Sequence, residues 1–358
     1  MINIDKEIEK IAITKRMYFE AGTHYKNLAE FLVSKDIECE IYPQGSFAYG
    51  AITKPINKEG FDIDLICEIK HDENSYPKKL MEKIKRLLNE SDDYKELLKE
   101  HDNGFSLEYK MCGYNFLIDI IPAVSPSSEK ILEISQKTEF SQFASSSILI
   151  PSKCESNFRY INSNPKGLKL WFDEINKDIL LLDESHTKSI TFNDSYLNYS
   201  SYEDIPDEYI ITNLQKCIML LKRNRDVYYQ NKKDVNKPIS GAICVLAATA
   251  CKYKKHFVNL ESMFREIVQF MASLHSNPNI LFKDSHGKWN LLNPANGLDN
   301  LVDSWSSDND FETFNKWIKS IEKSIPEINE RATILNMLGL TNETAKEINT
   351  FNKPWKND

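Results

Sequence analysis

Residues 61–69, which read FDIDLICEI, place two aspartates inside a segment whose apolar residues recur at every second position. This alternation is typical of a strand with one buried face. Because residues i and i+2 of a strand project to the same face, the carboxylates of Asp62 and Asp64 are expected to lie close together. Two like charges at close range, partly removed from water, need a cation or a shared proton. The sequence therefore predicts a strand that carries a cation site.

A third acid, Asp119, lies in an almost wholly apolar stretch, YNFLIDIIPA. Residues 105–110 and 113–121 are predicted to form a hairpin, so Asp119 can join Asp62 and Asp64 from a neighbouring strand. Three carboxylates on adjacent strands suit Mg²⁺, a hard cation that prefers oxygen ligands, with Mn²⁺ as a substitute. Two such ions about 4 Å apart clamp the attacking and leaving oxygens of an in-line nucleotidyl transfer. The alternative is an exposed sheet edge, with Asp119 paired to an arginine.

The segment Gln44-Gly45-Ser46 follows another alternating stretch, residues 37–43, which predicts a short strand running into a turn. A strand followed by Gly-Ser and the start of a helix presents free N–H groups to an anion, and a serine hydroxyl can add a contact to phosphate. Taken alone, these residues fit an ordinary turn equally well. Beside the three acids they favour binding of a triphosphate.

The periodicity of the sequence divides the chain into two parts. Residues 1–153 are predicted to form a mixed α/β lobe, with one or two helices between residues 5 and 35, broken near Ala21-Gly22, and a further helix over 77–100. Residues 154–358 are predicted to form a helical lobe. Its expected helices are 165–178, 207–230, 238–256, 258–275 and 308–351. The stretches 141–147 and 195–201 are predicted to be surface loops.

The composition excludes some classes of protein. The 358 residues carry a net charge of -8, with a pI near 5.6, which argues against binding of long nucleic acid because such binding needs many lysines and arginines. Seven cysteines without a CxxC pair are predicted to be reduced thiols. No leader pattern opens the sequence, and no apolar tract is long enough to span a bilayer. We expect a cytoplasmic monomer that needs neither a membrane nor long nucleic acid.

Candidate anion-binding cations lie near the end of the helix that is expected to finish at about residue 230. Lys222, Arg223 and Arg225 fall outside the apolar spacing of this helix, so they are expected to point away from the core, where one of them can meet a triphosphate. The alternative is a solvated helix end with Asp226 as an ion-pair partner. Ser240 is predicted to cap the next helix and to direct its hydroxyl at the same anion.

These motifs together resemble the polymerase-β-type nucleotidyltransferases and, more specifically, the bacterial CD-NTases, the cGAS/DncV-like nucleotidyltransferases of the SMODS group. The GS and DxD elements occur throughout the superfamily, whereas the later motifs are more specific. In chain order the matching segments are Gln44-Gly45-Ser46, Asp62-Ile-Asp64, 118–122, 164–172, LLKRNRD at 220–226, PISGAICVLAA at 238–248 and 289–305. The resemblance thus spans residues 44 to 305.

The resemblance implies an α+β fold, in which a polymerase-β-like nucleotidyltransferase lobe with a mixed sheet packs against a helical C-terminal lobe across a central cleft. It implies synthesis of a cyclic oligonucleotide, most simply a dinucleotide, from nucleoside triphosphates in CBASS anti-phage signalling, and an effector that senses the product. Asp62, Asp64 and Asp119 match the catalytic metal-binding acids. The residues that match nucleotide-binding positions are Gln44, Gly45, Ser46, Lys222 and Ser240.

Two positions depart from the pattern of the family. Ala51 stands where many relatives carry threonine, and Gly241 stands where relatives usually carry a bulkier residue. Two other functions fit the same acids and cations: nucleotidyl transfer to an RNA or protein acceptor, and a catalytically silent nucleotide or RNA sensor. The presence of all three acids favours an enzyme, because a binding module does not need their mutual repulsion.

Overall fold

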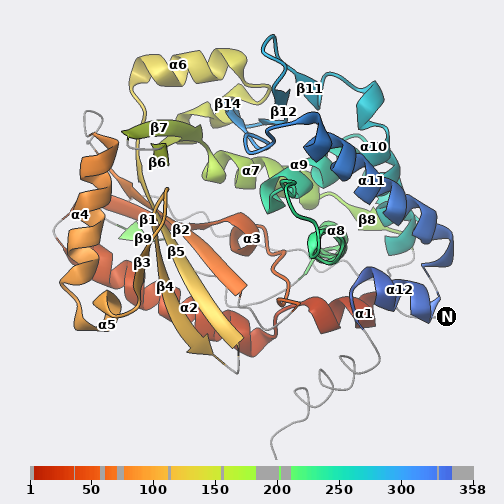
Figure 1. The fold of residues 1–358 in the computed structure, drawn as a ribbon, viewed down its shortest axis with the longest axis horizontal. Helices are drawn as coiled ribbons and strands as arrows, with labels where there is room; N and C mark the ends of the chain where they lie inside the picture. Colours follow the sequence, from red (N-terminus) through yellow and green to blue (C-terminus); the bar gives the residue numbers. More distant parts are fainter. Residues whose placement is uncertain are drawn as a thin grey trace, which may run out of the picture.

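The computed structural model describes residues 4–35, 37–56, 61–70, 76–111, 114–154, 157–182, 201–202, 211–328 and 330–340. Within these residues the fold is α+β, as predicted. A mixed sheet lies on one side of the molecule, most of the helices lie on the other, and the short helix α3 (Gly45–Ala48) lies between them (Figure 1).

The mixed sheet contains parallel and antiparallel strand pairs. Its strands run in the order β3-β4-β5-β2-β1-β9, and β6 joins β5 to β7. The pair β2·β5 is parallel, whereas β1·β2 and β4·β5 are antiparallel, so the predicted hairpin is confirmed. The strands are β1 (Cys39–Gln44), β2 (Phe61–Ile69), β3 (Leu98–Glu100), β4 (Phe105–Met111), β5 (Tyr114–Val124), β6 (Ile148–Cys154), β7 (Asn157–Ser163) and β9 (Ser201–Tyr202).

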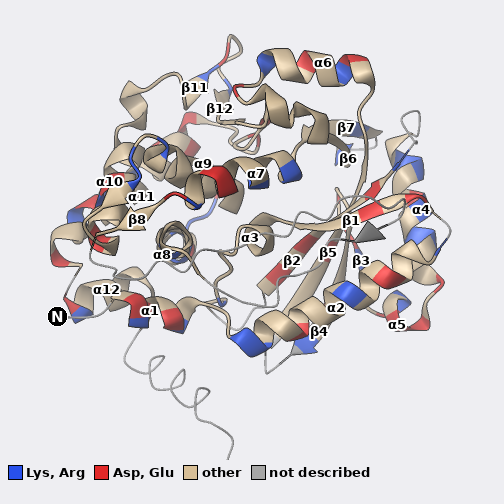
Figure 2. Cartoon of the chain, turned by 180° about the vertical axis from the view of Figure 1, so that it is seen from behind, with Lys and Arg blue, Asp and Glu red and all other residues tan. Residues whose placement is uncertain are grey.

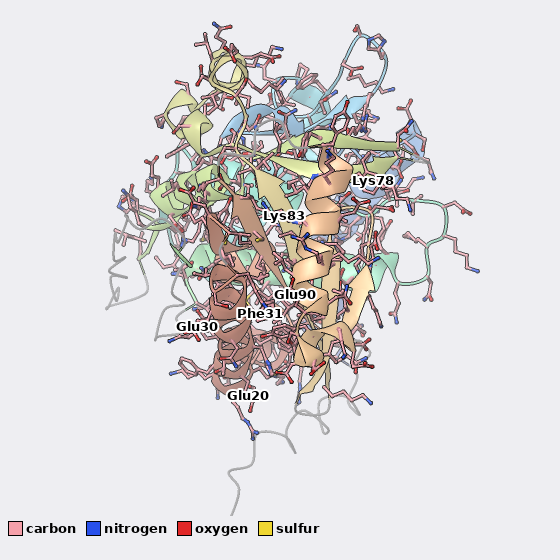
Figure 3. All side chains as sticks on the ribbon, turned by 90° about the vertical axis from the view of Figure 1, so that its left-hand side faces the viewer. Glu20, Glu30, Phe31, Lys78, Lys83 and Glu90 are labelled. Atoms are coloured by element: carbon pink, nitrogen blue, oxygen red, sulfur yellow. The ribbon has the colours of Figure 1, made fainter. Side chains whose placement is uncertain are left out.

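The two faces of the sheet differ in what covers them. The odd-numbered residues of β2 are apolar and pack against α2 (Lys15–Val33) and α4 (Pro77–Asn89). These two helices lie side by side over the strands (Figure 3), and Lys35 Nζ donates to Glu90 Oε2 at 3.1 Å between their C-terminal ends. The even-numbered residues of β2 include Asp62 and Asp64 and face the opposite way, toward the helical side of the molecule. One face of the sheet therefore builds a core with α2 and α4. The other face carries the two aspartates near the start of β2 and a smaller buried apolar cluster, which includes Ile66, further along the strand.

Two helix predictions in the first part of the chain are wrong. The break between α1 (Ile4–Ile11) and α2 lies at residues 12–14, where Thr14 caps α2 by accepting a hydrogen bond from the Met17 amide, and Gly22 lies inside α2. The predicted helix 77–100 contains α4, then α5 (Asp92–Lys95) and strand β3. Leu98 pairs with Leu107 of β4, so strand pairing with the following segment overrides the local helical spacing.

The helical lobe follows the predicted positions, except that the predicted helix 308–351 is divided at residues 325–330 into two helices. Its helices are α7 (Pro165–Asn176), α8 (Asn213–Tyr229), α9 (Ser240–Cys251), α10 (Leu260–Ala272), α11 (Asp308–Ser324) and α12 (Arg331–Met337), with α6 (Ser128–Lys137) above them in Figure 1. The short 3₁₀ helices of this part of the chain are η1 (Ser141–Ser146), η2 (Leu274–Ser276) and η3 (Ile325–Glu327). Its two-stranded ribbons are β8 (Leu180–Leu181) with β10 (His256–Phe257), β11 (Phe282–Lys283) with β12 (Trp289–Asn290), and β13 (Leu292–Asn293) with β14 (Asn296–Asn300). The predicted stretches 207–210 and 341–351 lie outside the described residues.

The core of the helical lobe includes the first helix of the chain. Ile4, Ile8 and Ile11 of α1 are buried with residues of α7 to α12. The predicted lobe boundary at 153/154 falls at the end of β6, and the sheet continues into β7. The N-terminal helix therefore packs in the core of the helical lobe, although most strands of the sheet lie between this helix and α7 in the sequence.

The stretch 141–147, predicted to be a surface loop, is instead the helix η1 and is partly buried. Phe143 is 9% exposed and Ser147 is 2% exposed. Asn164 donates to the Phe143 carbonyl at 2.8 Å and accepts from the Ser146 hydroxyl at 2.9 Å, so the amide of one asparagine fixes the turn. The stretch 195–200 lies outside the described residues, and Ser201 is in β9.

The six cysteines that the structure describes are free thiols, and all but Cys154 are buried. In the part of the chain that is described, every helix is too short or too polar to cross a bilayer.

Candidate active site

One row of residues crosses four strands of the sheet and defines the site. In the strand register Gln44 of β1 lies opposite Asp64 of β2, Asp64 opposite Asp119 of β5, and Asp119 opposite Ser106 of β4. Residues in one such row project to the same face. Asp62 lies two residues from Asp64 on that face, and Figure 2 shows the acidic band of β2 beside α3. The fold thus brings the three predicted acids together.

The three carboxylates form a cluster that suits a divalent cation. One oxygen each of Asp62, Asp64 and Asp119 lies within 4.8 Å of the others. Burial, together with the charges of Asp62 and Asp119, raises the pKa of Asp64 to about 8, and the charge of Lys222 opposes this shift. Burial also raises the pKa of Asp119, against a hydrogen bond from Ser106 that lowers it. Asp62 is exposed, so the cluster is open to solvent on one side. An all-carboxylate donor set with an open side fits Mg²⁺ or Mn²⁺.

Gly45 is required by the close approach of α3 to the acids. Its φ of +63° lies in the left-handed region, which residues with a Cβ seldom adopt. A Cβ at this position would also lie far inside van der Waals contact of Asp64 Oδ2. Gln44 precedes α3 as its N-cap residue and makes no side-chain capping bond, and Ser46 is half-buried in the first turn. The predicted Gly-Ser element therefore lies directly against the predicted metal-binding acids.

Helix α8 holds the segment that leaves α3. Gln215 Nε2 donates to the Tyr49 carbonyl at 2.8 Å, Lys222 Nζ to the Ala51 carbonyl at 2.7 Å, and Arg223 Nη1 to the Lys54 carbonyl at 2.9 Å. All three side chains are buried. The segment 49–54 is thus fixed from the helical lobe at three points, next to the acid cluster.

The burial of these cations corrects the expectation that they point away from the core. Lys222 is 4% exposed, and burial together with the nearby Arg225 lowers the pKa of its ammonium to about 8. Arg223 is 4% exposed and also donates to the Leu338 carbonyl at 2.8 Å. Arg225 is 6% exposed and pairs with Asp226 at 2.8 Å. The alternative of a solvated helix end is therefore wrong, although the predicted partnership with Asp226 is present.

Ser240 has a different local role from the one predicted. Ile239 occupies the N-cap position of α9, and no side chain caps that helix. Ser240 is the first helical residue, and its Oγ accepts a 3.5 Å hydrogen bond from Arg225 Nη1, which also donates to the Pro238 carbonyl at 3.0 Å. The helix therefore begins one residue earlier than the predicted cap implies. Binding of a nucleotide by Ser240 stays a prediction.

Sequence reasoning missed Ser106, His101 and Gln215. Ser106 donates a short hydrogen bond to Asp119 Oδ1, and its Oγ lies 2.7 Å from His101 Nε2. These contacts depend on how β4 pairs with β5 and on how α8 packs against residues 49–51, and neither arrangement has a local signal in the sequence. The polar Ser106 within the apolar alternation of residues 105–109 was the one available sign.

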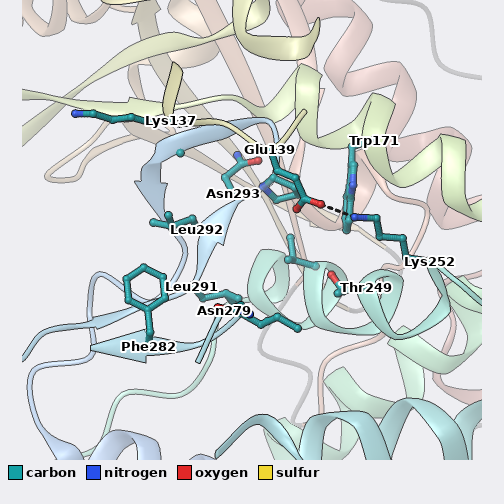
Figure 4. A pocket seen from close by; sticks show the side chains of 14 residues that line it. Lys137, Glu139, Trp171, Thr249, Lys252, Asn279, Phe282, Leu291, Leu292 and Asn293 are labelled. Atoms are coloured by element: carbon teal, nitrogen blue, oxygen red, sulfur yellow. Dashed lines mark hydrogen bonds and ion pairs between the residues drawn. The ribbon is translucent and has the colours of Figure 1, made fainter. Parts of the chain in front are cut away.

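A cavity lies in another part of the helical lobe. It has a volume of about 180 Å³, and Trp171, Thr249 and Phe282 are among its lining residues, next to the ion pair of Lys252 with Glu139 (Figure 4). None of the three acids lines this cavity. It is therefore separate from the acid cluster.

Taken together, the mixed sheet, the row of acids and the glycine-serine helix beside them define a nucleotidyltransferase of the polymerase-β type. Residues 5–176 match the Second Messenger Oligonucleotide or Dinucleotide Synthetase (SMODS) domain family. Residues 5–176, which contain the three acids and the Gly-Ser element, are therefore a domain of this family, and the comparisons support a bacterial CD-NTase.

Similar proteins of known name agree with this assignment. The c-di-GMP synthase of Roseivirga ehrenbergii is 25% identical over 310 residues, which cover 84% of this chain and 71% of that protein. The CD-NTase CdnG of Bradyrhizobium diazoefficiens, solved in complex with GTP, has a TM-score of 0.70 at 16% identity and covers 98% of both chains. The CdnC structure of E. coli MS115-1 with ATP has a TM-score of 0.62 at 12% identity, covering 92% of this chain and 94% of that one. The two structures show that the fold is shared.

Proposed function

We propose that the protein joins two nucleoside triphosphates into a cyclic dinucleotide, in a Mg²⁺-dependent reaction that releases pyrophosphate. The observation that carries the proposal is the row Gln44, Asp64, Asp119 on one sheet face, with Asp62 beside it and Gly45 directly against Asp64. The name of the Roseivirga relative supports a dinucleotide product, and GTP is the first substrate to test. The second messenger would act on an effector in CBASS anti-phage signalling, with the synthase working as a monomer.

Each predicted site residue has a proposed part in the reaction. Asp62, Asp64 and Asp119 would hold the metal ions, and bound Mg²⁺ supplies positive charge for the phosphate oxygens. Gln44, Gly45 and Ser46 would hold the donor triphosphate from the side of α3, and Lys222 and Ser240 would contact it from α8 and α9.

The chemical step is an in-line displacement. The acceptor hydroxyl forms a bond to the α-phosphorus, the bond to the pyrophosphate breaks, and Asp119 orients the hydroxyl and takes up its proton. A second round, in which the linear intermediate reverses its orientation, closes the ring. Asp64 and Asp119 can serve this step because adjacent strands hold their carboxylates in a fixed relation.

The test is incubation of the protein with all four ribonucleoside triphosphates and Mg²⁺, followed by mass spectrometry of the small-molecule fraction. We expect a cyclic dinucleotide and pyrophosphate from the wild type and neither from Asp62→Asn with Asp64→Asn, which removes the metal ligands and leaves the side-chain volume unchanged. Near-normal turnover of this double variant would show that these acids are not the metal ligands. Transfer of nucleotides only to RNA or protein would point to a macromolecular acceptor. Nucleotide binding without pyrophosphate release would point to a sensor.

A further inference from the structure

Ser106 lies directly opposite Asp119 in the antiparallel pair β4·β5. Its side chain is buried, at 2% exposure, and its hydroxyl donates a short hydrogen bond to Asp119 Oδ1. The same Oγ lies 2.7 Å from Nε2 of His101, which is exposed in the turn between β3 and β4. A continuous chain of hydrogen bonds therefore leads from the surface to one of the three acids.

The direction of this chain follows from the number of hydrogens. A serine hydroxyl has one hydrogen, and Asp119 accepts it. The short contact to His101 then requires that Nε2 carries a hydrogen and donates it to Ser106 Oγ. Donation by His101 makes the serine hydroxyl a stronger donor, because hydrogen bonds in a chain polarise one another. The order is therefore His101 to Ser106 to Asp119.

The turn that carries His101 is itself held against β5. The amide of His101 donates to the Gly104 carbonyl at 2.8 Å, and the Lys153 amide of β6 donates to the Asp102 carbonyl at 2.9 Å. A Cβ on Gly104 would overlap the carbonyl oxygen of Ile120, the residue after Asp119, so only glycine allows the turn to lie this close. The backbone thus places His101 within reach of Ser106 without help from the side chains.

The other two acids have no comparable support. Across the ranges that the structure describes, no side chain donates a hydrogen bond to Asp62 or Asp64. A carboxylate on a strand can rotate about its terminal torsion, which has a broad distribution of angles. Asp119, in contrast, has Oδ1 fixed by Ser106, so the terminal torsion of its carboxylate is restrained and Oδ2 is left for other partners.

We infer that Ser106 and His101 are positioning residues that fix the orientation of the Asp119 carboxylate, so that its free oxygen faces the metal site and the acceptor hydroxyl. This inference rests on the proposed function, in which Asp119 serves both groups. Ser106 acts on Asp119 directly, and His101 acts only through Ser106. The effect of this arrangement belongs to the chemical step more than to nucleotide binding, since the Ser106 hydroxyl bonds Asp119 and not the Gly-Ser element.

The first test compares Ser106→Ala with Ser106→Thr. Loss of a hydrogen bond to a charged group predicts that kcat falls roughly 10- to 100-fold in the alanine variant, while KM for the triphosphate changes by less than about 3-fold. Threonine keeps the hydroxyl and should restore most of kcat. The dissociation constant for Mn²⁺, measured on the protein without nucleotide by electron paramagnetic resonance of the free ion, should rise in Ser106→Ala. Ser147→Ala is the matched control, because Ser147 is equally buried and bonds Asn296 away from the acids.

The second test uses the order of the hydrogen bonds, from His101 to Ser106 to Asp119. His101→Phe should lower kcat, and His101→Gln, which can still donate a hydrogen bond, should retain more activity. Because His101 acts through Ser106, the double variant Ser106→Ala with His101→Phe should be no slower than Ser106→Ala alone. His275→Gln, at an exposed histidine of η2, is the control for histidine replacement.

The outcomes separate the inference from the proposed function. A wild-type protein that forms no product would contradict the proposed function, and the Mn²⁺ measurement would still test the positioning of Asp119. The inference is overturned if an active wild type and Ser106→Ala have equal kcat per folded molecule and equal Mn²⁺ affinity. It is also overturned if the two substitutions lower kcat by independent, multiplying factors.

Discussion

At the scale of single residues, the acid cluster restricts which residue can occupy position 45. Gly45 has a positive φ and lies directly against Asp64, so any Cβ would displace the carboxylate. Gly241 in α9 is a useful contrast, because a Cβ there would meet Ile239 at 3.8 Å and Leu301 at 3.9 Å, which is ordinary contact distance. Glycine at position 45 is therefore required by the backbone conformation and by the carboxylate of Asp64. Neither constraint applies at position 241.

Gly45→Ala should lower both stability and activity. A residue with a Cβ in this backbone region costs about 1–3 kcal/mol, and a displacement of about 1 Å at a reacting group can reduce turnover about 100-fold. Gly241→Ala, within a helix, should leave activity unchanged and raise stability by roughly 0.5–1 kcal/mol. Denaturant unfolding and steady-state kinetics of both variants check this prediction. Wild-type turnover in Gly45→Ala would show that the close approach to Asp64 has no role.

The raised pKa of Asp64 predicts how the metal-free protein responds to pH. Burial and the neighbouring carboxylates raise this pKa from 3.8 to about 8, so the folded state binds a proton that the unfolded state has released. The contribution of Asp64 to stability is therefore complete below pH 3.8 and is lost as the pH rises toward 8, by up to about 1.4 kcal/mol for each pH unit.

This dependence can be measured by unfolding in EDTA between pH 4 and pH 8. The free energy of unfolding of the wild type should fall relative to that of Asp64→Asn across this range, and Mg²⁺ should reduce the difference because a cation stabilises the ionised carboxylate. Parallel profiles for the two proteins in EDTA would contradict the raised pKa.

At the scale of elements, α8 is the link between the acid cluster and the helical lobe. Its side chains hold the carbonyl groups of residues 49, 51 and 54, which follow α3 directly. Lys222 is the one among them whose charge acts on the acids, since it opposes the raised pKa of Asp64. The same lysine is therefore suited both to fixing the segment and to meeting a triphosphate.

Lys222→Met separates these two roles. The substitution keeps the length of the side chain but removes the buried hydrogen bond to the Ala51 carbonyl, so the melting temperature should fall if Lys222 fixes the segment. If Lys222 contacts the triphosphate, KM should rise at least about 10-fold, with a smaller change in kcat, because a charge-assisted contact contributes about 1.5–3 kcal/mol. Lys216→Met is the control on the same helix, where Lys216 pairs with Asp5 at 2.7 Å. An unchanged KM would leave Lys222 with a structural role alone.

The elements also show what the sequence could and could not predict. The strands that carry Asp62, Asp64 and Asp119 were predicted because alternation with a period of two is local. Strand β3 was predicted as helix, because its three residues form a strand only through their pairing with β4. The positioning of Ser106 depends on the register of β4 against β5, which no local pattern encodes. The burial of Lys222 depends on the packing of α8 against residues 49–54, which is a contact between lobes.

At the scale of the whole molecule, two cores meet around the acid cluster. One core lies between the sheet and the helices α2 and α4, and the other joins α1 with α7 to α12. Tyr49 and Ala51, which follow α3, are buried in the helical core, whereas Phe47 of α3 is buried in the sheet core. The short segment beside the acids is therefore shared by both cores, which fixes it with respect to each lobe.

The central claim is that this arrangement makes a closed small-molecule product from nucleoside triphosphates. The most direct measurement is incubation with α-³²P-labelled GTP, unlabelled triphosphates and Mg²⁺, without RNA or a protein acceptor, followed by phosphatase treatment and separation of the products. Ring closure consumes both triphosphates and leaves no terminal phosphate, so the account predicts label in a small species that resists phosphatase. Label found only in linear, phosphatase-sensitive material, in polymer or in protein would contradict it.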